Sequence, residues 1–476
     1  MAKYLMQTAL GAAIAASVAA TPAFSQSVVE ELLGKMTESG GTVTFDKSQD
    51  GSTTTWSNIV AEGPDGDGKL TIDWVKEVEN GDAYTITMAP EAVMSFVDAG
   101  NEGTMTLGND GLAYLVNRSG DGLSMAYSAT SISFSIAAEP DLTDFTFTFN
   151  NVAGNDTFEG ADWASGSGQM QAGSMGMTFG VDDGDVAMEM DGSYDDISLT
   201  YAYAGFSPVV IEQDPAALLN ALVRFEMISG GGSGSGTIGE EGQKVSFTFS
   251  GGSSGAAFDM SDGNVTYSGE AAEIAYNVNP SEMGFPPFDV SMANAGFEFA
   301  LPIAKKDEAG DVRYLIELLG LEVSEGLWRM IDPGQTIPRD PADLVIDLAA
   351  TAKWLISPAE MGDNPPQAMP FEVEDVTVNE IRVSIGGAEI SANGSAQMMN
   401  GGPFPLPIGK LDIAINGVNG LIDKLTNLGL LTPDRILPVR ALMGLYTTPV
   451  GDDQMTSSIE MTADGQILAN GLPLPN

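Results

Sequence analysis

The sequence predicts a mainly β protein, built as a long, curved antiparallel sheet with a few short helices, among them helices at the C-terminus. Three observations support this prediction. Apolar and polar residues alternate over many stretches, short Gly-, Asp- and Asn-rich turns separate these stretches, and helical spacing is confined to a few segments. Alternation with period 2 gives a strand one apolar and one polar face. The sheet is therefore expected to have one apolar and one polar face.

The N-terminus has the features of an export signal. Lys3 precedes an apolar run at 10–20, and the small residues Ala23 and Ser25 follow it. The run is shorter than the about 20 apolar residues that span a bilayer. We therefore expect residues 1–25 to be a cleaved signal peptide and the mature chain to be periplasmic, with no later transmembrane segment.

The first half of the mature chain is predicted to contain two helices and many strands. Residues 28–38 have apolar side chains at helical spacing and precede Gly40 and Gly41, which end the helix. A second helix is expected at 215–227, because Asp214 is a suitable N-cap and Pro215 suits the first helical position. Strands are expected at 42–45, 69–75, 84–88, 105–107, 131–136, 145–149, 175–179, 186–190 and 197–203.

A segment of only Gly and Ser, at 230–236, predicts a flexible linker. It divides the mature chain into an N-terminal β-rich part, 26–229, and a C-terminal β-rich part with helices, 237–476. The alternative is one continuous sheet. Beyond the linker, helices are expected at 324–331, 418–428 and 433–446, and strands at 245–249, 265–267, 274–278, 297–303, 312–323, 373–378, 380–385, 389–396, 410–415 and in a closing hairpin at 458–468.

The composition excludes several kinds of chemistry and partner. The chain has 66 acidic and 19 basic residues, a formal net charge of −47, and neither His nor Cys. Ser-His-Asp and Cys-His catalysis and His-bearing metal sites are therefore excluded. Nucleic acid and anionic headgroups are poor partners for such a charge, because binding them depends on Lys and Arg. We expect a protein that is not an enzyme and has no cofactor.

One acidic turn offers ligands for calcium. Asp182, Asp183 and Asp185 surround Gly184, and carboxylates on a tight turn can bind Ca²⁺ through oxygen. The spacing does not match a twelve-residue calcium loop. The alternative is that Asp and Gly are present only because they form turns.

A Pro- and Gly-rich motif follows a tryptophan in the second half of the chain. It consists of Trp328, Asp332, Pro333, Gly334, Pro338, Arg339, Asp340 and Pro341. We interpret it as structural, because Pro and Gly set backbone geometry without supplying reactive groups. Asp332-Pro333-Gly334 is expected to end the helix that contains Trp328, and Arg339 to pair with Asp332 or Asp340 or to cap a chain end.

This motif resembles the corresponding segment of a secreted bacterial family, domain of unknown function 2125. Further matching features are Ile385-Gly386-Gly387, the run I-N-G-V-N-G-L-I-D-K-L at 415–425, and Asn470-Gly471 near the end. The family has no assigned activity to carry over. The C-terminal part is also similar to envelope proteins of the AsmA and TamB type, which implies an elongated sheet with an apolar inner groove.

The predicted function follows from location and pattern. We expect a non-enzymatic periplasmic protein that binds or shields a lipid or another apolar ligand in the cell envelope, with lipid or envelope proteins as partners. The alternative is a structural or adaptor protein that binds a basic partner through its acidic surface.

Overall fold

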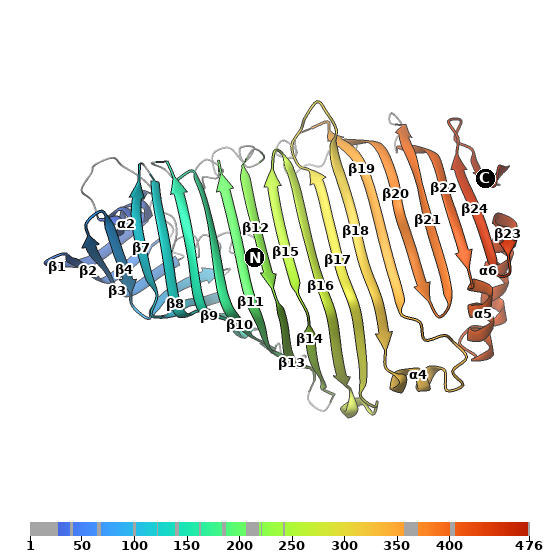
Figure 1. Ribbon diagram of the computed structural model, residues 1–476, viewed down its shortest axis with the longest axis horizontal. Helices are drawn as coiled ribbons and strands as arrows, with labels where there is room; N and C mark the ends of the chain where they lie inside the picture. Colours follow the sequence, from blue (N-terminus) through green and yellow to red (C-terminus); the bar gives the residue numbers. More distant parts are fainter. Residues whose placement is uncertain are drawn as a thin grey trace. The chain divides into compact units, whose positions relative to one another are not determined.

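The protein is mainly β, which confirms the predicted fold class (Figure 1). A computed structural model describes residues 27–474 except 39–40, 64–67, 99–100, 121, 139–141, 161–162, 183–186, 206–218, 220, 241–242, 357–369 and 400–404. Its strands belong to one sheet of 26 strands, and their described pairings are antiparallel. The signal peptide expected at 1–25 lies outside the described residues. The chain divides into two compact units, unit 1 (Met1–Ser246) and unit 2 (Phe247–Asn476).

Unit 1 contains one described helix, α2, and the first strands of the sheet. Their bounds are α2 (Val28–Glu38), β1 (Thr42–Asp50), β2 (Thr53–Glu62), β3 (Gly68–Asn80), β4 (Ala83–Met88), β5 (Glu91–Asp98), β6 (Asn101–Asp110), β7 (Ala113–Ser119), β8 (Gly122–Ala138), β9 (Leu142–Glu159), β10 (Ser165–Asp182), β11 (Ala187–Ala204), β12 (Leu222–Ser229) and β13 (Gly231–Gly239). Strand β14 (Val245–Gly251) follows.

Unit 2 contains the remaining strands, three α-helices and one short 3-10 helix among its described residues. Their bounds are β15 (Ser254–Ser261), β16 (Asn264–Asn279), η2 (Ser281–Met283), β17 (Phe288–Pro302), β18 (Gly310–Val323), α4 (Glu325–Ile331), β19 (Ala342–Trp354), β20 (Phe371–Ile385), β21 (Ala388–Met399), β22 (Leu406–Asn416), α5 (Val418–Asn427), α6 (Pro433–Tyr446), β23 (Thr448–Gly451), β24 (Gln454–Met461), β25 (Ile467–Ala469) and β26 (Leu472–Pro473). The helices predicted at 324–331, 418–428 and 433–446 are thus present as α4, α5 and α6.

The core of unit 1 forms where α2 packs on one face of the sheet. Val28, Val29 and Leu33 of α2 are buried in a cluster with Trp56 and Phe158 from the strands. The carboxylate of Glu77 accepts a hydrogen bond of 3.1 Å from the N–H of Val29, so it satisfies a free donor at the start of α2. A second cluster, which includes Leu112, Ile132, Val152, Met175 and Ile197, lies farther along the same strands.

Several strands of unit 1 are interrupted at the same level, along what we call the bulge line. Asn151 of β9 and Asp196 of β11 have φ of 54° and 51°, and both lie beside Gly173 of β10. The line continues to Asn58 of β2, with φ of 51°. At the same level Pro90 separates β4 from β5. Bulges bend a strand and increase its twist, so the line sets where these strands change direction.

Two predictions in this region are wrong. Residues 230–236 are not a linker, because 231–239 form strand β13, which pairs with β11 from Ala187↔Gly239 to Asp195↔Gly231. Glycine leaves room here for a side chain of the neighbouring strand, because a Cβ on Gly232 would clash with the Tyr194 ring. The division between units falls after Ser246.

The prediction of a helix at 215–227 is also wrong for the second half of this segment. Residues 222–229 form strand β12, in which Phe225 pairs with Tyr201 and Val223 with Tyr203 of β11. Aromatic and β-branched residues favour strands when they have such cross-strand neighbours, and this pairing overrides the capping signal. The first half of the expected helix lies outside the described residues.

Candidate functional site

Unit 2 has a face of mostly apolar side chains, which we call the apolar face. Eight strands, β15–β22, lie side by side here (Figure 1). Directly paired residues of antiparallel strands point to the same side, so apolar rows cross the sheet. One row contains Phe258, Tyr267, Phe299, Tyr314, Leu348, Val378 and Leu411, and the next contains Phe297, Ile316, Ile346, Ile381, Ala392 and Ile413.

The described residues of unit 2 leave the apolar face partly exposed. Both hydrophobic clusters of the described residues belong to unit 1, and many side chains of the apolar face are half-exposed. Tyr267 and Tyr314 are 47% and 39% exposed, although they contact neighbouring rings. The ring of Tyr267 lies 4.9 Å from that of Phe297, and the ring of Tyr314 lies 5.1 Å from that of Phe299. Contiguous exposed apolar patches of this kind mark sites for ligands, partners or membranes.

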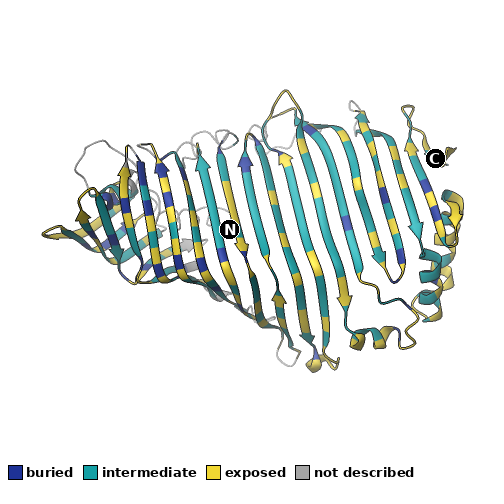
Figure 2. Ribbon diagram, viewed as in Figure 1, coloured by how far each residue is buried: buried dark blue, intermediate teal, exposed yellow. Residues whose placement is uncertain are grey.

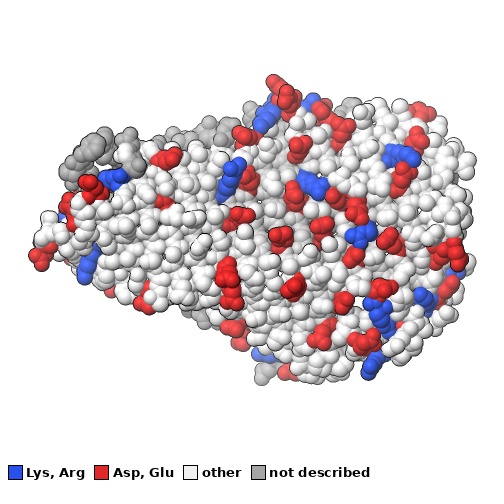
Figure 3. Space-filling view, in the orientation of Figure 1, with Lys and Arg blue, Asp and Glu red and all other residues white. Residues whose placement is uncertain are grey.

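The opposite face of unit 2 is polar and carries ion pairs between neighbouring strands. Arg313 of β18 makes a two-pronged contact with Asp347 of β19. Arg382 of β20 donates to Asp343 of β19 at 2.7 Å and to Glu380 at 2.8 Å. Acidic and basic side chains are spread over the face shown in Figure 3. Partly exposed pairs contribute little stability each, so this face is mainly a solvated surface.

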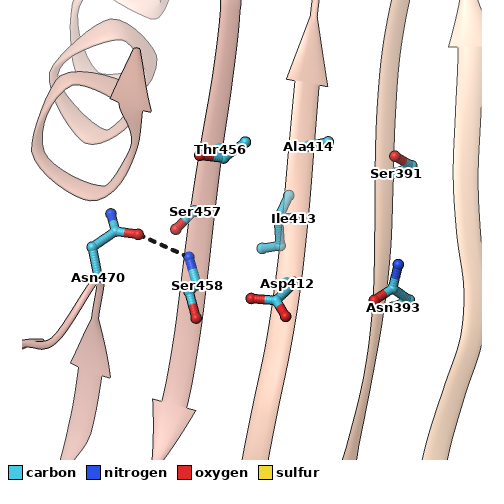
Figure 4. A pocket seen from close by; sticks show the side chains of 9 residues that line it. All are labelled: Ser391, Asn393, Asp412, Ile413, Ala414, Thr456, Ser457, Ser458 and Asn470. Carbon is cyan, nitrogen blue, oxygen red and sulfur yellow. Dashed lines mark hydrogen bonds between the residues drawn. The ribbon is translucent and has the colours of Figure 1, made fainter. Parts of the chain in front are cut away.

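A polar cavity of about 310 Å³ lies near the end of the chain (Figure 4). Ser391, Asn393, Asp412 and Ser458 line it, among others, and the Asn470 side chain accepts a hydrogen bond of 2.9 Å from the N–H of Ser458. A hydrogen bond from Lys410 holds the pKa of Asp412 below its usual value. The lining contains one carboxylate and several hydroxyl and amide groups, without a second acid or a base, so it is not arranged for acid–base catalysis.

The structural motif of residues 328–341 is organised around Asp332, which has no exposed surface. Its carboxylate accepts hydrogen bonds from the N–H groups of Thr336 (3.1 Å) and Ile337 (2.8 Å) and from the guanidinium of Arg339 (3.0 Å). The guanidinium also lies over the Trp328 ring, 4.2 Å from its centroid. The sequence left both Asp332 and Asp340 as carboxylate partners for Arg339, and in the structure Arg339 binds Asp332.

Opposing effects act on the pKa of Asp332. Burial by itself raises it, but the hydrogen bonds from Ile337 and Thr336, with the charge of Arg339, lower it to about 2. Every atom that the carboxylate binds belongs to the motif itself. The motif therefore fixes a loop.

This loop packs on the turn between β20 and β21 and on α5. A Cβ on Gly386 would lie 3.0 Å from Ile337 and from Leu421, and one on Gly387 would lie 3.0 Å from Pro338. A Cβ on Gly417 would clash with the carbonyl oxygen of Gly387. The motif, the Gly386-Gly387 turn and the start of α5 are therefore one packed assembly.

Gly417 tests this assembly. We expect Gly417→Ala to lower the urea midpoint of the full chain clearly more than Gly465→Ala, which is the matched control. Both glycines have positive φ, of 68° and 80°, so each alanine costs about 1–2 kcal/mol of backbone strain. Only Gly417 also meets backbone, because nothing lies within 4 Å of a Cβ on Gly465. Equal losses in the two variants would contradict the close packing.

The predicted calcium ligands are only partly described. Asp182 ends strand β10, whereas Asp183 and Asp185 lie outside the described residues. Among the described residues, no group of three or more acidic side chains is placed to hold a metal ion. Calcium binding at this turn stays a prediction.

Sequence reasoning missed a buried carboxyl group in unit 1. Asp156 of β9 is 6% exposed, and the hydroxyl of Tyr201 donates to it at 2.9 Å. Burial raises the pKa of Asp156 to about 6, although the bond from Tyr201 opposes the shift. The signal in the sequence is its position two residues before Phe158, which places it on the inward side of the strand.

Four tyrosines surround this carboxyl group. Tyr201 and Tyr203 come from β11, Tyr127 from β8 and Tyr114 from β7. Burial raises the pKa of all four, to about 12 for Tyr114 and Tyr203, and the charge of Asp156 adds to the effect. None of these phenols ionises near neutral pH, so Asp156 is the group of this cluster that titrates there.

The fold and its surfaces define an antiparallel β protein whose described residues include a partly exposed apolar sheet face. No described helix combines the length and apolar character needed to cross a bilayer. The chain belongs to a family of uncharacterised proteins conserved in bacteria, DUF2125, whose model matches residues 204–475. No curated protein and no solved structure matches the chain. The matched residues include the motif around Asp332 and all strands of the apolar face.

Proposed function

We propose that this protein is a non-enzymatic periplasmic protein of the cell envelope that holds a lipid, or another apolar ligand, on the apolar face of unit 2. The observation that carries the proposal is the continuous set of half-exposed apolar rows across β15–β22. At about 4.8 Å between strands, eight strands make a face roughly 40 Å wide.

The energetics favour an apolar occupant. A fully buried methylene contributes about 0.8 kcal/mol, and one that lies on an open face contributes part of this, so an acyl chain still gains several kcal/mol before the loss of its own freedom. A lipid also protects the protein, because a large uncovered apolar sheet face promotes aggregation. The polar face on the other side keeps the complex in contact with water.

Two surface variants test this function. Phe299→Glu with Ile346→Glu places charges on the apolar face, and we expect it to weaken binding of a fluorescent fatty acid, cis-parinaric acid, at least roughly tenfold. Ala300→Glu with Ala349→Glu adds the same charge on the polar face, where both residues pair with Arg313. This control is expected to bind within about twofold of the wild-type chain.

The measurement is a fluorescence titration of the full mature chain, with circular dichroism to show that each variant is folded. Mass spectrometry of an organic extract of the protein purified after export identifies the natural occupant. Equal fatty-acid affinity in the two variants, or an extract without lipid, would contradict the proposal. Recovery of protein partners that dissociate with salt would then favour the adaptor role.

A further inference from the structure

Helix α6 is apolar around most of its circumference and yet lies on the surface. Its exposed leucines are Leu437 (69%), Leu442 (54%) and Leu445 (64%), and none of its residues is fully buried. Figure 2 shows exposed residues along most of its length. A helix that is hydrophobic on all sides is normally buried, but the described residues leave the outer side of α6 exposed.

The outward side of α6 has a defined pattern. With 3.6 residues per turn, Leu437, Leu442 and Leu445 gather on one side of the helix. Arg435 and Arg440 flank them on the two edges of this side, and Asp434 lies on the same side one turn before Leu437. The half-buried Ile436 and Met443 lie on the opposite side. Exposed leucines on the outward side of a surface helix can enter the interface of a membrane.

The orientation of α6 is fixed by side chains from the rest of unit 2. The carbonyl oxygen of Tyr446, at its end, accepts hydrogen bonds from Ser457 (2.7 Å) and from the amide of Asn470 (2.9 Å). Arg440 donates to Asp423 of α5 at 2.5 Å. The leucines are therefore held outward by the fold.

The local charge differs from that of the whole chain. Helices α5 and α6 together carry three basic residues, Lys424, Arg435 and Arg440, against two acidic ones, Asp423 and Asp434, in a chain with 66 acidic and 19 basic residues. Asp453, which accepts hydrogen bonds from the N–H groups of Asn419 and Gly420 at the start of α5, brings this part close to charge balance, so it repels anionic headgroups less than the rest of the surface does. Guanidinium groups bind phosphate well, so Arg435 complements lipid phosphates, whereas Arg440 is paired with Asp423.

The size of the patch argues against a second copy as the occupant. A helix of 14 residues is about 21 Å long, and its outward side covers roughly 200 Å². A stable protein–protein interface buries about 800 Å² on each partner. A bilayer has no such requirement, because it receives a few aliphatic side chains without a complementary shape.

We propose that α6 docks on the surface of a phospholipid bilayer, with Leu437, Leu442 and Leu445 at the acyl boundary and Arg435 at the phosphates. This surface is separate from the apolar face, and the proposal holds whether or not that face carries lipid. Docking would place unit 2 against a membrane without a transmembrane helix.

The test is co-sedimentation of the full mature chain with vesicles of phosphatidylcholine, alone or with phosphatidylglycerol. The wild-type chain is expected to sediment with both and more strongly with the anionic mixture. Leu437→Glu with Leu445→Glu is expected to bind at least roughly tenfold more weakly. Ala300→Glu with Ala349→Glu adds equal charge away from α6 and is expected to bind like the wild-type chain.

Two further variants separate the contributions. Arg435→Gln is expected to weaken the preference for anionic vesicles and to keep binding to phosphatidylcholine. Phe299→Glu with Ile346→Glu is expected to keep vesicle binding even where fatty-acid binding is lost, which distinguishes this proposal from the lipid-holding function. Absence of wild-type binding, or equal binding by the Leu437 and Leu445 variant, would overturn it. A dimer that only this variant abolishes, without vesicle binding, would show a protein interface instead.

Discussion

The Asp156→Asn variant is expected to gain stability relative to the wild-type chain as the pH rises from 4 to 8. The pKa of Asp156 is raised to about 6 in the folded chain, so the folded state binds a proton more tightly than the unfolded state does. This group therefore stabilises the fold fully below the unfolded pKa, near 3.8, and its contribution is lost as the pH rises through 6. The relative change is on the order of 3 kcal/mol.

Urea unfolding of both chains at several pH values measures this difference. Groups common to the two chains cancel in the comparison, and the neighbouring tyrosines do not titrate in this range. Asparagine keeps an oxygen that accepts the bond from Tyr201. Asp191→Asn, an exposed carboxylate on β11, is the matched control and is expected to differ by less than about 0.5 kcal/mol at every pH. A constant difference between Asp156→Asn and the wild-type chain would refute the raised pKa.

Asp332→Ala is expected to lower the melting temperature of the full chain by about 5–10 °C near neutral pH. It removes the acceptor of two backbone N–H groups and leaves the guanidinium of Arg339 without its buried partner. Because the folded pKa is lowered to about 2, the wild-type carboxylate stabilises the chain above about pH 4 and loses this effect as the pH falls through 2. The two chains should therefore converge in strong acid.

Asp340→Ala is the control for this experiment. Asp340 lies in the same motif but is exposed, and its loss is expected to change the melting temperature by less than about 2 °C. Scanning calorimetry from pH 2 to pH 7 measures both variants. A larger loss of melting temperature from Asp340→Ala than from Asp332→Ala would show that Arg339 depends on Asp340 and not on Asp332.

Local signals in the sequence predicted the helices of unit 2 well. The helix expected at 433–446 has these bounds in the structure, and α4 and α5 differ from their predictions by one residue at one end. Pro at a helix start and Gly before or after a helix act through the backbone itself, so they hold without tertiary information. The segment 312–323 was predicted to be a strand, and it forms strand β18.

The strand interiors were harder to predict, because turn-forming residues also occur within strands. Strand β11 is continuous over 187–204, where two strands separated by a turn were expected. Asp195 and Asp196 resemble a turn in the sequence, but Asp196 forms a bulge. The Gly and Ser residues of β13 also led to a wrong prediction. The contact of Gly232 with the Tyr194 ring of the neighbouring strand cannot be seen in the local sequence.

The candidate sites depended on contacts between distant segments. The motif around Asp332 was recognised as structural, but the sequence left two partners open for Arg339, and burial of Asp332 decides between them. The environment of Asp156 comes from three other strands, so no local pattern contains it. The exposure of α6 was also hidden, because an apolar helix is normally expected to be covered.

The bulge line of unit 1 limits how proteins of this architecture change in length. Asn151 and Asp196 flank Gly173, so a residue inserted into one of these strands would shift its bulge away from those of its neighbours. It would also turn the following side chains to the opposite face. A whole hairpin with its own aligned bulges causes neither problem. Relatives of different length are therefore expected to differ by pairs of strands. In an alignment of such relatives, the gaps are expected to fall at the ends of hairpins.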